Sequence, residues 1–181
     1  MSEEPLSFTH HSSLITHHCF RMLLARASHK LIEEFHRHFA GDESLRLPPV
    51  HLYNGRFARW LTHTFNIGAI TFGRHVFIKP ELTRREATGR WTAPAWLIAH
   101  ETTHVLQYEK AGFVGFLISY LRDYWCCLRV QKRWDAVARM EAYHTIKAEC
   151  AARDAEGAYA AWAEKQAGAM KTEGEKNGYS V

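Results

Sequence analysis

The feature that most constrains this chain is a His-Glu-x-x-His motif at residues 100–104, which lies inside the largely apolar stretch 96–107. On an α-helix with about 3.6 residues per turn, His100 and His104 lie one turn apart on the same face, so their imidazoles can bind one metal ion. Glu101 is rotated by about 100° from His100, which keeps its carboxylate outside the coordination sphere but close to a metal-bound water. The motif therefore predicts a metal-binding helix with a general base beside the metal.

The residues around the motif favour this interpretation over a chance match in a chain with 13 histidines. Pro94 is typical of a helix start, and apolar residues such as Leu97 and Val105 indicate a helix that is buried. Two imidazoles and a carboxylate would be costly in a buried helix unless a cation is bound to them. We therefore expect His100 and His104 to bind a metal ion.

Length and composition predict one folded domain with loose ends. The chain has 181 residues, of which 46% are hydrophobic, and this is enough to form a sizeable core. We expect a mobile N-terminal arm at residues 1–18, a single domain at 19–167 and a disordered Gly- and Lys-rich tail at 168–181. The net charge of +4 is small and its basic residues are scattered, so we predict no nucleic-acid partner.

The cysteines and the N-terminus indicate a reducing compartment. Four cysteines without Cys-x-x-Cys spacing, two of them adjacent, do not predict a disulfide framework. The first residues are acidic and lack the apolar core of a signal peptide, so we expect a cytoplasmic location. The apolar run at 113–121 is too short to span a bilayer. We expect it to form a buried helix, with contact to a partner or to a membrane surface as the alternative.

Periodicity and the positions of Pro and Gly predict a chain with more helix than strand. The expected elements are a helix over residues 20–39 that ends near Gly41, a short strand around 50–53, a hairpin or bulged strand over 66–80 that turns near 73–74, a surface loop over 81–91, the motif helix from 93 to Gly112, and an Ala-rich helical region over 134–165. The histidines of the first helix are expected on its polar or flanking faces.

A third protein ligand must come from outside the motif, because a catalytic tetrahedral metal site usually has three protein ligands and a water. Cys126 or Cys127 would suggest a closed structural site instead. The Ala-rich region offers several carboxylates, of which Glu149 lies on a face of small and apolar residues. This face favours Glu149 as the ligand, while Glu141 and Glu156 remain alternatives.

The sequence resembles the gluzincin-type zincin metallopeptidases, in which a His-Glu-x-x-His helix is followed by a helix that carries a glutamate ligand. More closely, segments 68–78 (GAITFGRHVFI) and 99–107 (AHETTHVLQ) are similar to a group of bacterial metallopeptidase-like domains with a Gly-containing strand followed by an AHExxHVxQ helix. Segment 147–153 (KAECAAR) matches the acidic helix of that group best. The resemblance covers residues 66–160, and Thr102 stands where an apolar residue is commoner.

The resemblance implies an α+β, predominantly helical, zincin-like fold in which a small sheet or hairpin packs on the motif helix and on the downstream ligand-bearing helix. It implies that His100, His104 and Glu149 bind zinc and that Glu101 is the general base and acid. Zincins hold an extended peptide against a strand, and residues 70–79 are placed to provide that strand. Tyr143 and His144 are candidates for stabilising the oxyanion.

These features lead to a main hypothesis and two rivals. The main one is a zinc-dependent peptidase that hydrolyses a peptide or protein substrate through a metal-activated water. The first rival is a non-catalytic, metal-containing binding or assembly module, for example of a bacterial secretion or injection apparatus, with helix 113–121 covering the cleft. The second is a membrane-docked protein with an incidental motif. An open coordination position would favour the enzyme, and a site sealed by side chains would favour the module.

Overall fold

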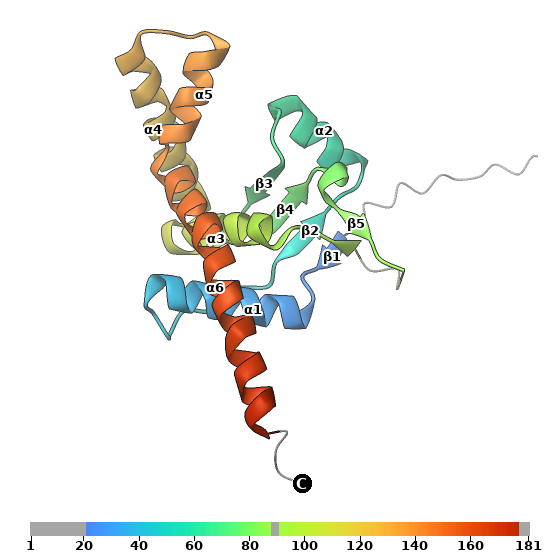
Figure 1. Ribbon diagram of the computed structural model, residues 1–181. Helices are drawn as coiled ribbons and strands as arrows, with labels where there is room; N and C mark the ends of the chain where they lie inside the picture. The colour runs from blue at the N-terminus through green and yellow to red at the C-terminus, as the bar shows by residue number, and fades with distance from the viewer. Residues whose placement is uncertain (1–20, 88–90, 178–181) are drawn as a thin grey trace, which may run out of the picture.

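The computed structural model describes residues 21–87 and 91–177 and shows a predominantly helical α+β fold, as predicted. A small mixed sheet lies beside a larger group of helices (Figure 1). The strands are β1 (Arg21–Leu23), β2 (His51–Tyr53), β3 (Ala69–Phe72), β4 (His75–Ile78), β5 (Arg84–Arg85) and β6 (Trp91–Thr92). The helices are α1 (Arg26–Ala40), α2 (Arg56–Phe65), the 3-10 turn η1 (Pro80–Leu82), α3 (Ala95–Ala111), α4 (Phe113–Gln131), α5 (Ala136–Thr145) and α6 (Lys147–Asn177).

The main sheet has the strand order β1-β2-β4-β3, so that β3 is an edge strand. Strands β3 and β4 form the predicted antiparallel hairpin, and Gly73 turns it with φ of +59°. Strand β2 runs parallel to β4, and helix α2 comes between the two strands in the sequence. Helix α2 was not among the predicted elements. Leu52 and Val76 lie side by side on the face of the sheet that is buried.

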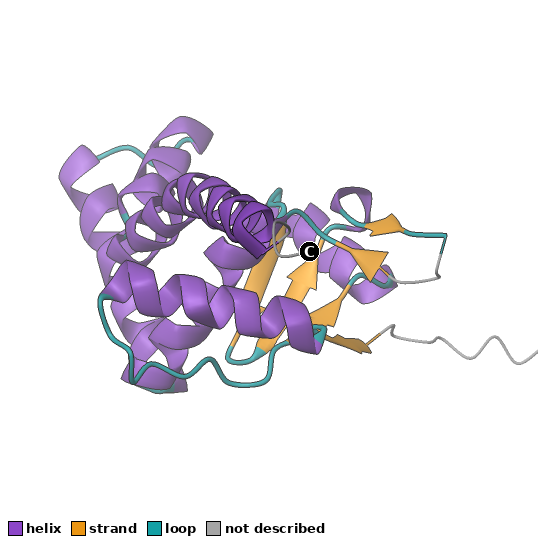
Figure 2. Ribbon diagram, turned by 60° about the horizontal axis from the view of Figure 1, so that its bottom comes forward, coloured by secondary structure: helices purple, strands orange, loops and turns teal. Residues whose placement is uncertain are grey.

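The main core lies between this face of the sheet and helices α1, α3 and α6. Figure 2 shows these helices packed around α6, with the strands beside them. Phe35 of α1 packs against the rings of Tyr159 and Trp162 of α6. Helix α3 begins after Pro94 and ends before Gly112, as predicted, and crosses between the sheet and α6. The motif helix is therefore held on both sides by buried contacts.

Helix α1 differs from its prediction at the start and on one face. It begins at Arg26 rather than at residue 20, because residues 21–23 are extended and pair with β2. It ends at the expected place, where Gly41 adopts a left-handed conformation with φ of +63°. The prediction that the histidines lie on polar or flanking faces of this helix is wrong for His36, which is buried and lies 2.8 Å from Thr102 Oγ1 of α3.

Three predictions for the C-terminal half need correction. Residues 113–121 do form a helix, but most of their side chains are exposed, and Phe116 is the one among them that is buried. The Ala-rich region is divided into α5 and α6 by an extended residue, Ile146. Helix α6 continues to Asn177, past residue 168 where we expected the tail to begin. The expected N-terminal arm at 1–18 lies outside the described residues.

Candidate metal centre

The structure brings the two motif histidines and Glu149 together. His100 and His104 lie one turn apart on α3, and Glu149 lies in the first turn of α6, which crosses α3. The Nε2 atom of His100 is 3.5 Å from Oε2 of Glu149, and the Nε2 atom of His104 is 3.4 Å from Oε1. One ligand atom from each of the three residues lies within 4.8 Å of the other two. This group of side chains could hold a metal ion.

Hydrogen bonds at the far side of each imidazole fix the ring orientation. Nδ1 of His104 lies 2.9 Å from the side-chain oxygen of Gln107, whose amide nitrogen donates to the carbonyl of Ala148. The Gln107 oxygen must therefore accept a hydrogen bond from the N–H of Nδ1 of His104. Nδ1 of His100 likewise lies 3.1 Å from a carboxylate oxygen of Glu156, which can only accept when ionised. Both Nε2 atoms thus point their lone pairs at Glu149, as in a metal site.

The distances across the cluster favour a cation between the three groups over a proton shared by two of them. A charge-assisted N–H···O bond is about 2.7 to 2.9 Å long, shorter than the 3.4 and 3.5 Å found here. Ligand atoms about 2.1 Å from a tetrahedral metal are about 3.4 Å apart, which agrees with these separations. Oε2 of Glu149 is also buried without a hydrogen-bond partner among the described residues. The donor set therefore fits a metal ion.

The electrostatics of the cluster also favour a cation. Burial raises the pKa of Glu149, but contacts with His100 and His104 reverse this effect and hold its pKa well below the ordinary range. Burial lowers the pKa of His104, but contact with Glu149 and the charge of Glu101 more than compensate, so that the pKa of His104 is raised. Glu149 is consequently ionised, which is the form in which a carboxylate binds a metal ion.

Glu101 lies next to the cluster but is held apart from it. Its carboxylate is buried, and Thr71 of the edge strand β3 donates a 2.6 Å hydrogen bond to Oε2. Burial raises the pKa of Glu101, although contacts with His104, Thr71 and His100 lower it in part. This arrangement is suited to a group that takes up and releases a proton.

Residues 30–112 match the eCIS core domain. Comparisons with curated proteins and with solved structures gave no match. The matched segment runs from α1 to the end of α3 and includes His100, Glu101 and His104, whereas Glu149 follows it. The match points to a module of a secretion or injection apparatus.

Other predicted site residues lie at different distances from the cluster. Tyr143 is partly buried, and burial followed by the charge of Glu149 raises its pKa. His144 is exposed, and its Nδ1 lies 2.8 Å from Arg153. The structure therefore brings Tyr143, but not His144, to the candidate metal centre.

The alternative ligands are not part of the cluster found among the described residues. Glu141 is exposed, and Glu156 contacts the far side of His100 rather than its Nε2 atom. Cys126 is exposed and Cys127 lies in a small second core with Leu128. Glu149 is thus the carboxylate that completes the group.

The prediction from sequence did not include Tyr120 of α4, whose hydroxyl donates a 2.8 Å hydrogen bond to Oε1 of Glu149. Burial and the charge of Glu149 raise the pKa of Tyr120, which keeps the phenol protonated. Aromatic residues recur at three- and four-residue steps along this face of α4, at 113, 116, 120 and 124. That periodicity was the available signal, but it does not reveal which element the face contacts.

Helix α4 also encloses the candidate metal centre. Phe116 packs near the ring of His104 with a centroid distance of 6.1 Å, and Tyr120 contacts Glu149. The side chains of His100, His104 and Glu149 are only 5% to 12% exposed. In this conformation the cluster is shielded by side chains rather than open to bulk solvent.

Proposed function

We propose that this chain is a metal-binding module of an extracellular contractile injection system, in which His100, His104 and Glu149 hold a zinc ion. The observation that carries the metal is the convergence of three acceptor groups at separations of 3.4 and 3.5 Å without a donor between them. The injection-system assignment is supported by the eCIS core domain match over residues 30–112. The enclosure of the cluster by α4 supports a structural or assembly role.

Zinc is the ion that suits this donor set. Two imidazoles and one carboxylate are borderline ligands, and zinc accepts them in tetrahedral geometry. Gln107 and Glu156 would orient the imidazoles, as partners of metal-bound histidines commonly do. Because α3 and α6 contribute ligands from distant parts of the chain, bound metal would stabilise their packing.

The metal is tested by elemental analysis of the purified protein before and after chelation. We expect about one equivalent of zinc, and we expect His104→Ala and Glu149→Gln to lose it together with thermal stability. His38→Ala and Glu141→Gln are matched controls because both residues are exposed and lie outside the cluster. Unchanged zinc content in either ligand variant would disprove the site.

The injection-system role is tested with purified particles. Contractile particles are prepared from cells that express the full chain with an epitope tag and are separated by sedimentation. We expect the chain to sediment with the particles and to stay in the supernatant when no particle is made. A chain that remains soluble in both samples would disprove the assembly role while leaving the metal site intact.

Peptide-bond hydrolysis is a second candidate function, and the position of Glu101 favours it. When bound, zinc would polarise a carbonyl and lower the pKa of a water. Glu101 would take up the proton at Oε1, because Thr71 already occupies Oε2. The free edge of β3 could pair with an extended peptide. A substrate could enter only if α4 moved, since Phe116 and Tyr120 cover the cluster.

Measurements on the variant Glu101→Gln distinguish the two candidate functions. This change preserves the shape of the side chain and removes the base, so zinc should stay while hydrolysis of a denatured protein substrate falls by about a hundredfold or more. Zinc at one equivalent without cleavage by the wild type would favour the non-catalytic module. Undiminished cleavage by Glu101→Gln would exclude Glu101 as the base.

A further inference from the structure

Helix α4 carries a stripe of exposed apolar side chains. Val114, Ile118, Leu121 and Trp125 follow one another at steps of four, three and four residues, so they share one face of the helix. Each of them is between 49% and 66% exposed. A continuous apolar stripe of this kind on a surface marks a site of interaction. We refer to these four residues as the α4 stripe.

The α4 stripe faces away from the rest of the protein. Phe116 marks the inward side of α4, because its ring lies 4.1 Å from the ring of Tyr108 on α3. Ile118 is two residues farther along and is thus turned by about 200° from Phe116. Figure 1 shows α4 and α5 extending side by side away from the sheet, with their connection at the far end. The stripe is therefore accessible along the outside of this helical hairpin.

Two tryptophans lie together at the far end of the stripe. Trp125 contacts Trp134, which precedes α5, with a ring-centroid distance of 5.4 Å. Both rings are about half exposed. Tryptophan is enriched where proteins meet the interface between lipid headgroups and acyl chains, because its ring is apolar and its N–H is polar.

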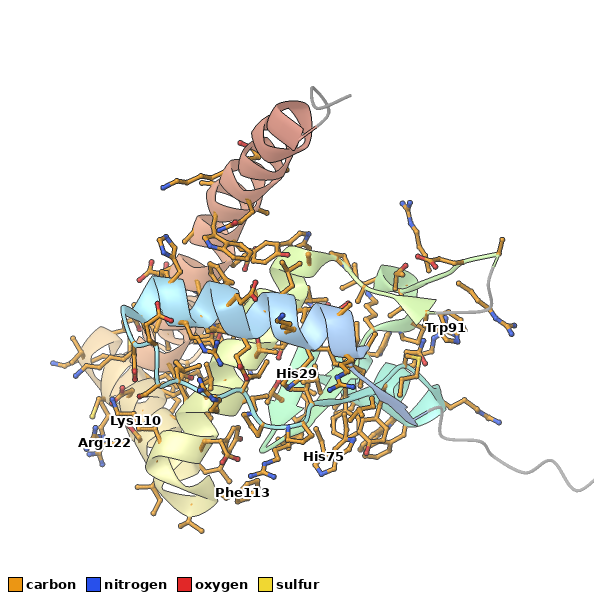
Figure 3. All side chains as sticks on the ribbon, turned by 90° about the horizontal axis from the view of Figure 1, so that it is seen from below. His29, His75, Trp91, Lys110, Phe113 and Arg122 are labelled. Atoms are coloured by element: carbon orange, nitrogen blue, oxygen red, sulfur yellow. The ribbon has the colours of Figure 1, made fainter. Side chains whose placement is uncertain are left out.

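The charges beside the stripe are predominantly basic. Arg122 and Arg129 follow Ile118 and Trp125 by four residues, so they flank the stripe on the outer side of α4. Lys132 adds positive charge next to the tryptophans, whereas Arg133 is paired with Asp135 at 2.9 Å. Asp123 forms a 3.4 Å ion pair with Arg122, but its side chain is only 17% exposed whereas that of Arg122 is 66% exposed. Figure 3 shows Arg122 of α4 on the opposite side of the view from Trp91 of β6.

We propose that the α4 stripe docks on the surface of an anionic lipid membrane, with α4 lying in the interface and the metal centre on the other side of the helix. The apolar stripe would enter the headgroup region while the flanking arginines contact lipid phosphates. No helix among residues 21–87 and 91–177 is long and apolar enough to cross a membrane, which is consistent with docking on one leaflet. This inference does not depend on the bound metal or on hydrolysis.

The charge pattern favours a lipid surface over a second copy of the chain. The spacing of the stripe would also suit a helix-to-helix contact. In a twofold symmetric dimer, however, the basic flanks of the two stripes would face each other and repel. An anionic membrane supplies the opposite charge along the whole helix.

The proposal is tested by co-sedimentation of the full chain with phosphatidylcholine vesicles that contain or lack phosphatidylglycerol. We expect binding to anionic vesicles, weakening at high salt, with a shift of tryptophan fluorescence to shorter wavelength. The variant Arg122→Gln/Arg129→Gln should bind anionic vesicles about twenty-fivefold more weakly, since each basic residue near the surface contributes about fivefold. Equal binding to both vesicle types would overturn the electrostatic part of the proposal.

The apolar part is tested with Ile118→Ser/Leu121→Ser, which should weaken vesicle binding at least about tenfold. Trp60→Ser/Phe65→Ser is the matched control, because it removes two exposed apolar residues from α2. Circular dichroism verifies that all variants are folded. The proposal fails if the wild type does not bind vesicles, or if the control variant loses as much binding as the stripe variant. A wild-type dimer that Ile118→Ser/Leu121→Ser dissociates would also overturn it, since a second copy would then cover the stripe.

Discussion

Replacing His36 with glutamine tests how a buried histidine couples α1 to the motif helix. Thr102 Oγ1 lies 2.6 Å from the carbonyl of Ile98 and donates to it, so the 2.8 Å bond to His36 must be donated by the imidazole. The glutamine amide can donate the same hydrogen bond but has no titratable group. The substitution therefore removes protonation at this position while retaining the contact.

The size of the effect follows from burial. Burial lowers the pKa of His36 from 6.5 to about 4, because the charged imidazolium loses its hydration in the core. Since the folded-state pKa lies below the unfolded-state value, the stabilisation is fully present above pH 6.5 and is lost as the pH falls through 6.5 toward 4. A shift of this size corresponds to a loss of about 3 kcal/mol in the free energy of unfolding.

The assay is urea unfolding followed by circular dichroism at about pH 7.5 and about pH 4.5. Between these pH values the wild type should lose about 2.5 kcal/mol more stability than His36→Gln, and all other titratable groups are shared by both proteins. His38→Gln removes an exposed histidine from the same helix and should keep the wild-type loss. An equal pH dependence in wild type and His36→Gln would refute the reasoning.

Three further substitutions test the orientation of the candidate ligand, the core and a helix end. Gln107→Leu removes the hydrogen-bond acceptor for Nδ1 of His104. We expect zinc affinity, measured by competition with a chelator, to fall by about 10- to 100-fold. An affinity within twofold of wild type would contradict this role of Gln107. Phe35→Ala leaves a cavity beside Tyr159 and should lower the free energy of unfolding in urea by about 3 to 5 kcal/mol, so a loss below about 1 kcal/mol would be inconsistent with the packing. Gly41→Ala places a Cβ atom on a residue with φ of +63°, where no other atom lies within 4 Å. It should lower the free energy of unfolding in urea by about 1 kcal/mol through backbone strain alone. An unchanged stability would argue against the left-handed helix end.

Local features of the fold could be predicted because short-range rules govern them. The start of α3 after Pro94 and its end before Gly112 follow from backbone stereochemistry at those two residues. The turn of the β3–β4 hairpin at Gly73 follows for the same reason. Helix α2 was missed because its sequence carries few start signals, and its N-cap position is held by Gly55 without a side-chain hydrogen bond.

The candidate metal centre also has one part that the sequence predicts and another that only the packing of the helices decides. Residues His100 and His104 belong to one helix, so their spacing alone predicts that they face one ion. Glu149 could be favoured by its neighbours on α6, but Glu141 and Glu156 satisfied the same one-dimensional pattern. The crossing of α6 over α3 selected among them, because it points Glu149 at the Nε2 atoms and leaves Glu156 at the far side of His100.

The sequence by itself determined that one helix presents two imidazoles and a carboxylate, since helical geometry is fixed by neighbouring residues. The tertiary structure alone decided that Tyr120 reaches Glu149, that His36 is buried against Thr102 and that the α4 stripe is exposed. An apolar helical face indicates that something will cover it but not which surface does so. Which surface covers the face depends on how distant segments of the chain pack. In this fold the inner face of α4 packs against the candidate metal centre, and its outer face is in contact with solvent.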